Sequence, residues 1–295
     1  MAGAVKPIYY LWRLCISHSR IKPGTGSAKC RDLLELLAQR IADFCFMLIP
    51  RKRPSRQRLM DCRLVSHRGE HDNRRTRENT LAAFRAVAAA GIWGIEFDVR
   101  WTRDLHPVVI HDPTSGRVFG KDLSVADVSL EQLRRQIPEI PTLEEVVAEF
   151  GGHTHLMVEL KHDRLDRDEI KAARLEEIFS ALRAGRDFYF LALQADLFEP
   201  VAFAGASSCL LVAELDISRF SRQVIDNGYG GLCGHYLLLS NALLERHHAQ
   251  GQKLGSGFPA SRQCFYRELN RGVDWVFTNR ALKLGAIRRC LLERD

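Results

Sequence analysis

Short β-rich runs alternate with helical patterns through most of this 295-residue chain, from Cys62 onward. Strands that alternate with helices favour βα units and a parallel sheet. Eight such units in about 230 residues fit a closed (β/α)8 barrel, whose usual length is about 250 residues. We therefore predict an α/β fold of the TIM-barrel class. The predicted strands are RLVSH (63–67), WGIEFDV (93–99), HLMVELK (155–161), FYFLALQ (188–194), SCLLVAE (208–214), GGLCGHY (230–236), QKLGSGF (252–258) and DWVFTN (274–279).

A ninth run, HPVVIHD (106–112), does not fit this count. Only the short turn WTRDL separates it from the second strand, whereas a parallel crossover needs a dozen or more residues. We therefore expect an antiparallel β-hairpin arm that rises above the barrel after the second strand. Such an arm would bring His111 back beside Asp98.

Helical patterns with recognisable ends lie between the strands. In TLAAFRAVAAAG (80–91), Thr80 can cap the helix and Gly91 can end it. PTLEEVVAEFGG (141–152) has its proline near the helix start and its glycines after the end. Further helices are expected within 168–185, 240–251 and 259–272.

The basic character of the chain belongs to its first 60 residues. They carry 12 Lys and Arg against 3 acids, whereas the remaining residues carry 31 against 33. We predict two parts, a basic and partly helical extension (1–60) and a catalytic barrel domain (61–295). The pattern over 32–49 is amphipathic and is followed by RKRPSRQR, a combination that can lie on an anionic membrane. A helix packed on the barrel, or coding sequence upstream of the true start, explains it equally well.

Eight cysteines are scattered without a CxxC pair. This spacing argues against a zinc knuckle or a disulfide framework, so we expect reduced thiols and a cytoplasmic protein, with membrane contact only at the periphery. No apolar stretch reaches the length of about 18 to 20 residues that a membrane-spanning helix needs. No nucleic-acid partner is expected, because nothing beyond the basic extension supports one.

Three carboxylates fall on the inward face of two predicted strands. Residues two apart in a strand share a face, so Glu96 and Asp98 project together, and Glu159 with Lys161 repeats the pattern on the next strand. Active sites of this fold lie at the C-terminal strand ends. Clustered carboxylates need a countercharge, and an all-oxygen set indicates one divalent cation, Mg²⁺ or Ca²⁺. The alternative is a structural ion pair between Glu159 and Lys161.

Two histidines are placed to reach the same strand ends. His67 ends the first predicted strand and is followed by Arg68, which can hold a phosphate bidentately, and by Gly69, which permits a close turn. His111 comes from the predicted hairpin. Two imidazoles across a metal-bound phosphate suit general acid and general base roles. A lone histidine at a strand end is more often structural.

The ordered set VSHRG, ENTLAAF, GIEFDV, TRD, VVIHD, IPTLEEV, MVELK and GVDWVFTN resembles the glycerophosphodiester phosphodiesterase family over residues 63 to 285. The resemblance implies a TIM-barrel hydrolase of glycerol and lipid metabolism that converts a glycerophosphodiester into glycerol 3-phosphate and an alcohol. It implies that His67 and His111 are the catalytic acid/base pair, in either assignment. It implies that Glu96, Asp98 and Glu159 bind the metal, and that Arg68 and Lys161 bind the phosphate. Glu78 and Asn79 would brace the loop, and Asp112 would orient His111.

The chain departs from the family pattern at the rim. Arg77 stands where the family usually has a proline, SGFPAS (256–261) stands where a tryptophan-containing segment is usual, and the closing motif reads Thr278-Asn279. These changes concern the choice of alcohol more than the metal site. The amphipathic basic extension motivates an alternative function, a lysophospholipase D or cyclising lyase that acts on lysophospholipids with the same site. A non-enzymatic barrel would have lost site residues, and all are present.

The segment EHDNRRTR (70–77) remains open at this stage. It is either a solvated insert or additional charge at the substrate entrance. His71 and Asp72 are for that reason not among the expected catalytic residues.

Overall fold

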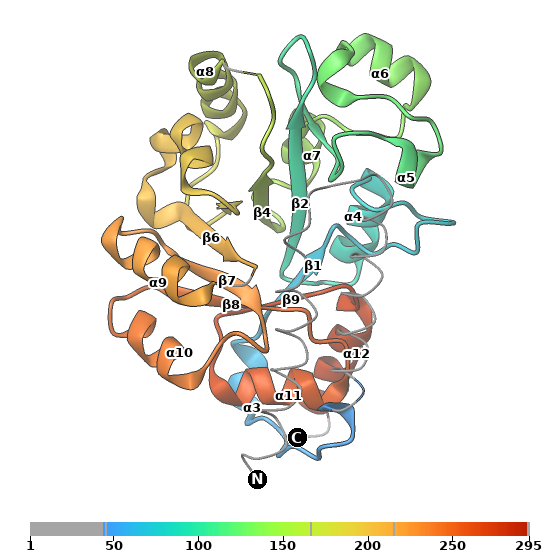
Figure 1. The fold of residues 1–295 in the computed structure, drawn as a ribbon. Helices are drawn as coiled ribbons and strands as arrows, with labels where there is room; N and C mark the ends of the chain where they lie inside the picture. The colour runs from blue at the N-terminus through green and yellow to red at the C-terminus, as the bar shows by residue number, and fades with distance from the viewer. Residues whose placement is uncertain (1–43, 45, 166, 215, 294–295) are drawn as a thin grey trace, which may run out of the picture.

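The computed structural model describes residues 44, 46–165, 167–214 and 216–293 (Figure 1). Eight parallel strands close on themselves, because neighbouring strands pair around the whole ring and β1 pairs with β2 to complete it. The predicted TIM barrel is confirmed. Each strand lies within two residues of its predicted bounds: β1 (Arg63–His67), β2 (Gly94–Trp101), β4 (His155–Leu160), β5 (Phe188–Ala192), β6 (Cys209–Ala213), β7 (Gly231–His235), β8 (Lys253–Gly257) and β9 (Trp275–Thr278).

The predicted hairpin is also present. β3 (Pro107–Val109) runs antiparallel to β2, with Val99 opposite Val109 and Trp101 opposite Pro107. Beyond it, α5 (Gly116–Phe119), a 3-10 turn (Val125–Asp127) and α6 (Leu130–Gln136) form a small cap. The cap has its own apolar cluster, which the sequence analysis did not anticipate. Its buried members are Val108, Ile110, Val125, Leu133, Ile137 and Ile140.

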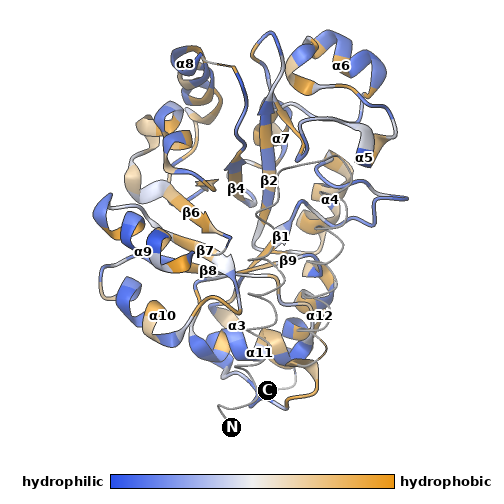
Figure 2. Ribbon diagram, in the orientation of Figure 1, coloured by the Kyte–Doolittle hydropathy of each residue, from blue (hydrophilic) through white to orange (hydrophobic). Residues whose placement is uncertain are grey.

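Helices surround the barrel and turn their apolar faces to it (Figure 2). Thr80 caps its helix as expected, since its side chain accepts a hydrogen bond from the Ala83 amide. A 3-10 segment, η2 (Ala195–Ala204), replaces a regular helix between β5 and β6. The helices are α3 (Arg56–Met60), α4 (Leu81–Ala89), α7 (Leu143–Phe150), α8 (Asp168–Phe179), α9 (Ile217–Asp226), α10 (Asn241–His248), α11 (Arg262–Arg271) and α12 (Ala281–Glu293).

The two-residue period of the strands separates two apolar layers. Ile95, Phe97 and Val99 of β2 belong to the layer between strands and helices. The barrel interior has a separate cluster that includes Val65, Met157 and Trp275. Because residues alternate along β2, Glu96 and Asp98 face the interior.

Most of the predicted amphipathic helix over 32–49 lies outside the described residues, as does nearly all of the extension before residue 46. The described part packs on the barrel: Phe46 makes an edge-to-face contact with Tyr236, and Leu59 is fully buried in the main core. Membrane contact by residues 1–60 and the boundary at residue 60 stay predictions. Among the described residues, no helix combines the length and apolarity that crossing a membrane requires.

Candidate active site

Glu96, Asp98 and Glu159 converge at the C-terminal end of the barrel. Asp98 on β2 pairs in register with Glu159 on β4, and Glu96 lies two residues earlier on the same face of β2. Each contributes a carboxylate oxygen to a group whose members all lie within 4.8 Å of one another, and all three residues are buried. The structure therefore brings together the three carboxylates that the strand pattern selected.

Two cations partly offset the charge of this carboxylate cluster. Nζ of Lys161 lies 2.8 Å from Oδ1 of Asp98 and also contacts Glu159, and Nε of Arg68 lies 3.2 Å from Oδ2 of Asp98. Burial alone would raise the pKa of Asp98, but Lys161 and Arg68 outweigh it and hold that pKa well below its usual range. Burial and the charges of Asp98 and Glu159 instead raise the pKa of Glu96 well above its usual range. Glu96 is thus the carboxylate most in need of a countercharge.

The cluster fits a hard divalent cation. Oε1 of Glu96 is buried and accepts no hydrogen bond from the described residues, a costly situation for a carboxylate oxygen. A cation held by Glu96, Asp98 and Glu159 would satisfy it. An all-oxygen donor set suits Mg²⁺ or Ca²⁺ better than zinc.

His67 stands at the end of β1, beside this cluster. Its Nε2 lies 3.7 Å from Oε2 of Glu96, and its Nδ1 lies 2.6 Å from Oδ1 of Asn279. Because Asn279 Oδ1 is an acceptor, the Nδ1 atom carries the proton and Nε2 presents its lone pair. Burial, reinforced by the Arg68 guanidinium, lowers the pKa of His67 to about 3. The ring also packs against Phe258, with centroids 4.7 Å apart.

His111 follows the hairpin strand β3, and its orientation is fixed by its sequence neighbour. Its Nδ1 lies 2.6 Å from Oδ1 of Asp112, as expected for a carboxylate that orients the ring. The backbone carbonyl of His111 accepts a hydrogen bond from Nε of Arg100, at 2.7 Å. The imidazole is half-buried. Contacts therefore fix both the backbone and the imidazole of His111.

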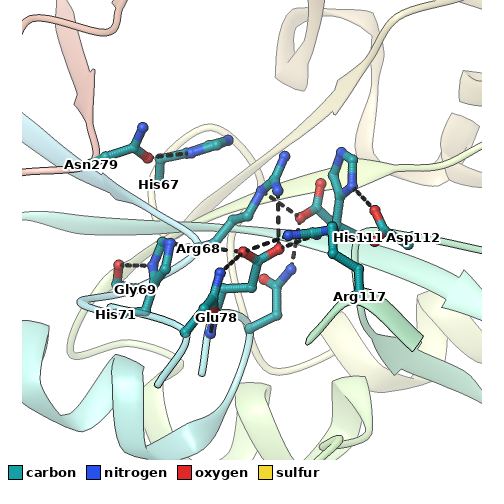
Figure 3. Close-up of polar contacts among 12 residues, drawn as sticks. His67, Arg68, Gly69, His71, Glu78, His111, Asp112, Arg117 and Asn279 are labelled. Atoms are coloured by element: carbon teal, nitrogen blue, oxygen red, sulfur yellow. Dashed lines mark hydrogen bonds and ion pairs between the residues drawn. The ribbon is translucent and has the colours of Figure 1, made fainter. Parts of the chain in front are cut away.

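A chain of ion pairs connects His111 to the carboxylate cluster (Figure 3). Arg117 of the cap contacts Asp112 through Nε, and its Nη2 lies 2.6 Å from Oε1 of Glu78. Glu78 in turn lies 3.0 Å from Nη1 of Arg68, which reaches Asp98. The cap therefore contributes one residue, Arg117, to the support of both histidine-bearing segments. Arg117 was not among the predicted site residues, and no sequence pattern near it marks it.

The loop that follows β1 adopts a backbone conformation that restricts its residues. Arg68 and Asn79 both have positive φ values, 58° and 57°, which is uncommon outside glycine and is found where surrounding structure imposes it. Gly69 has a φ of 78°, and a Cβ there would come within 2.7 Å of Cβ of Ala83. Close packing on α4 thus requires the glycine that the sequence analysis assigned to a tight turn. Asn79 donates to Asp98 at 2.8 Å, in agreement with a bracing role.

The segment 70–77 folds around its own polar groups. One carboxylate oxygen of Asp72 accepts hydrogen bonds from the backbone amides of Arg74, Arg75 and Thr76. Asn73 exchanges two hydrogen bonds with Glu78, at 2.6 Å and 2.8 Å. These bonds explain the presence of Asp72 and Asn73 without a role at the substrate. His71 lies 3.0 Å from the Gly69 carbonyl oxygen and is likewise a loop contact.

Comparison with known proteins extends these observations. Residues 67–204 match the family model described as the Glycerophosphoryl diester phosphodiesterase family. A human glycerophosphodiester phosphodiesterase 1 is 38% identical over an alignment of 103 positions that covers 30% of this chain and 30% of that protein. A glycerophosphodiester phosphodiesterase from Caldanaerobacter subterraneus is 36% identical over an alignment of 110 positions that covers 33% of this chain and 44% of that protein. The matched stretches thus span less than half of these relatives.

Solved structures share the barrel over most of its length. A Thermotoga maritima glycerophosphodiester phosphodiesterase aligns with a TM-score of 0.64 and 24% identity, covering 77% of this chain and 98% of that one. An Oleispira antarctica phosphodiesterase in complex with its product sn-glycerol-3-phosphate aligns with a TM-score of 0.65 and 21% identity, covering 76% and 95%. At this level of identity the likeness shows the fold.

Proposed function

Because this chain belongs to the glycerophosphodiester phosphodiesterase family, we propose that it hydrolyses glycerophosphodiesters to glycerol 3-phosphate and an alcohol. The observation that carries the proposal is the buried triad of Glu96, Asp98 and Glu159, with His67 3.7 Å from Glu96 and with His111 near enough for its charge to lower the pKa of Asp98. The named activities of the relatives and the product bound to the Oleispira antarctica enzyme agree with this chemistry.

The proposed metal ligands are Glu96, Asp98 and Glu159. A Mg²⁺ or Ca²⁺ ion held by them would supply positive charge to the phosphate of the substrate. Arg68 and Lys161 lie against the same carboxylates and keep unused donor hydrogens, so they can also hold phosphate oxygens. Their charges would stabilise the negative charge that builds up during displacement.

His67 and His111 are the proposed proton-transfer pair. Each ring engages its Nδ1 atom with a fixed acceptor, Asn279 or Asp112, which leaves its Nε2 atom available to the substrate. One imidazole would take the proton of the attacking group, either water or the substrate's own hydroxyl, and the other would protonate the leaving alkoxide. Asp112 and Asn279 are the proposed positioning residues, because they hold the two rings in one tautomer.

The test is an activity assay of the full chain on glycerophosphocholine, with glycerol 3-phosphate measured as the product. Turnover should require a divalent cation, should stop with EDTA and should be lost in His67→Ala and His111→Ala. Lysophosphatidylcholine is the comparison substrate, because the same site would serve a lysophospholipase D. Strong preference for that lipid, or full activity with EDTA, would contradict the proposal.

A further inference from the structure

A cavity of about 700 Å³ opens at the end of the barrel opposite the candidate active site. Its walls come from the N-terminal ends of the strands, where β1 and β8 begin at Arg63 and Lys253, and from α3 and α12, which contact each other. This volume is in the range of small-molecule sites, about 300 to 1,000 Å³. The carboxylate cluster lies at the other ends of the strands, so the cavity is a separate feature.

The cavity is lined by an excess of cations. Five basic side chains reach it against two acidic ones, Asp61 and Asp274. Asp274 already pairs with His248, at 2.8 Å, and Asp61 accepts hydrogen bonds from Gln57. Within the described part of the chain, none of the five cations forms an ion pair with a carboxylate. They are Arg58, Arg63, Lys253, Arg288 and Arg289.

Contacts with uncharged groups fix the positions of four of these cations. Arg288 donates to the carbonyls of Leu59 and Met60, at 2.6 Å and 3.2 Å, and Arg289 donates to that of Ala90. Nζ of Lys253 lies 2.7 Å from the Tyr189 hydroxyl. The Arg63 guanidinium lies over the indole of Trp93, 5.6 Å from its centroid. Because a guanidinium has five N–H donors, each arginine keeps donors for a ligand.

We propose that this cavity, here called the basal cavity, binds a phosphate group carried by a small polar molecule or by an anionic lipid headgroup. A concave site with an excess of one sign of charge concentrates its field and attracts counter-ions. The arginines would supply planar pairs of donors that match phosphate oxygens. Because existing contacts already hold several of these side chains in place, binding would cost less side-chain entropy. This assignment is independent of the reaction at the other end of the barrel.

The test uses the full chain and inorganic pyrophosphate, titrated calorimetrically in the presence of EDTA. Arg58→Gln/Arg63→Gln removes two cavity charges whose side chains donate no hydrogen bond among the described residues. The matched control, Arg222→Gln/Arg246→Gln, removes the same charge from exposed positions on α9 and α10. We expect the cavity variant to bind at least about tenfold more weakly, since one lost charge-assisted contact is worth about that factor. The control should bind as the unaltered chain does.

Equal affinity in the cavity variant and the control would overturn the proposal. The charge-retaining Arg58→Lys/Arg63→Lys protein should restore most of the binding, and a protein no better than the glutamine variant would count against the basal cavity. Vesicles of phosphatidylcholine with and without phosphatidic acid distinguish the two sources of phosphate. Binding to free pyrophosphate indicates a soluble ligand, whereas binding only to the acidic vesicles, lost in the cavity variant, indicates a lipid headgroup.

Discussion

Nη2 of Arg117 lies 2.6 Å from Oε1 of Glu78, although the two residues are 39 positions apart. This contact joins the cap beyond the hairpin to the loop that follows the first barrel strand. Arg117 also contacts Asp112, which orients His111, and Glu78 also contacts Arg68, which reaches Asp98. A residue outside the barrel therefore supports both halves of the candidate site.

Replacing Arg117 by alanine should lower kcat by about 10- to 100-fold, the usual cost of losing a residue that orients catalytic groups. KM should change less, because Arg117 acts through Asp112 and Glu78. Arg117→Lys should recover part of kcat, since it keeps the charge. Steady-state kinetics on glycerophosphocholine measure both constants.

Arg135 provides the control for this experiment. It pairs with Glu131 on the exposed face of α6 in the same cap, and both side chains are more than two-thirds exposed. Arg135→Ala should leave kcat unchanged, because exposed pairs of this kind contribute little. Equal losses in the two variants would mean that the cap as a whole, and not Arg117, supports the site.

The barrel strands could be predicted because each combines a short β-rich run with a polar residue near its C-terminal end. The carboxylates followed from the same periodicity, since Glu96 and Asp98 had to share a face. Parallel pairing then placed Glu159 beside them, and in the structure Asp98 lies in register with Glu159. The local sequence pattern and the barrel topology were sufficient to predict the strands and the carboxylates on their inward face.

The remainder of the site depends on contacts between distant segments. Asn279 lies 212 positions from His67, and the sequence showed it only as a departure from a family motif. Arg117 belongs to a four-residue helix in a cap of short elements, where neither helical nor strand periodicity can develop. The bonds within residues 70–77 were likewise not foreseen, because Asp and Asn act there through local backbone geometry.

The carboxyl of Glu78 should make stability depend on pH. Burial alone would raise its pKa, but the hydrogen bonds of Arg117 and the charge of Arg68 lower it to about 2. The unfolded chain, with an ordinary pKa near 4.5, then binds the proton more readily. This contribution to the free energy of unfolding is present above about pH 4.5 and is lost as the pH falls towards 2. Its size should be on the order of 3 kcal/mol.

Urea unfolding of the unaltered chain and of Glu78→Gln across this pH range measures the effect. The difference between the two proteins should be largest near neutral pH and should shrink as the pH falls. A constant difference would show that Glu78 stabilises the fold by packing and not by its charge.

Alanine substitutions at Gly69 and Gly91 should separate the stability cost of backbone strain from that of steric crowding. Both have positive φ values, 78° and 64°, so backbone strain alone should make alanine at either position cost about 1 to 2 kcal/mol. An added Cβ at Gly69 would meet Cβ of Ala83 at 2.7 Å, whereas at Gly91 nothing lies within 4 Å. Gly69→Ala should therefore lower the free energy of unfolding by at least about 1 kcal/mol more than Gly91→Ala. Equal losses in denaturant titrations would mean that α4 moves to accommodate the methyl group.

Glu96→Gln should separate stability from activity. The amide cannot take on the negative charge that burial, Asp98 and Glu159 disfavour at this position, so without metal the variant should melt at a higher temperature than the unaltered chain. It should also lose about a hundredfold or more of the metal-dependent turnover, because one proposed ligand no longer carries charge. Added Mg²⁺ or Ca²⁺ should raise the melting temperature of the unaltered chain and of the surface control Glu176→Gln, since a ligand that binds only the folded state stabilises it. If either ion stabilised Glu96→Gln to the same extent, the cation would have to bind elsewhere, and the assignment of Glu96 as a ligand would be wrong.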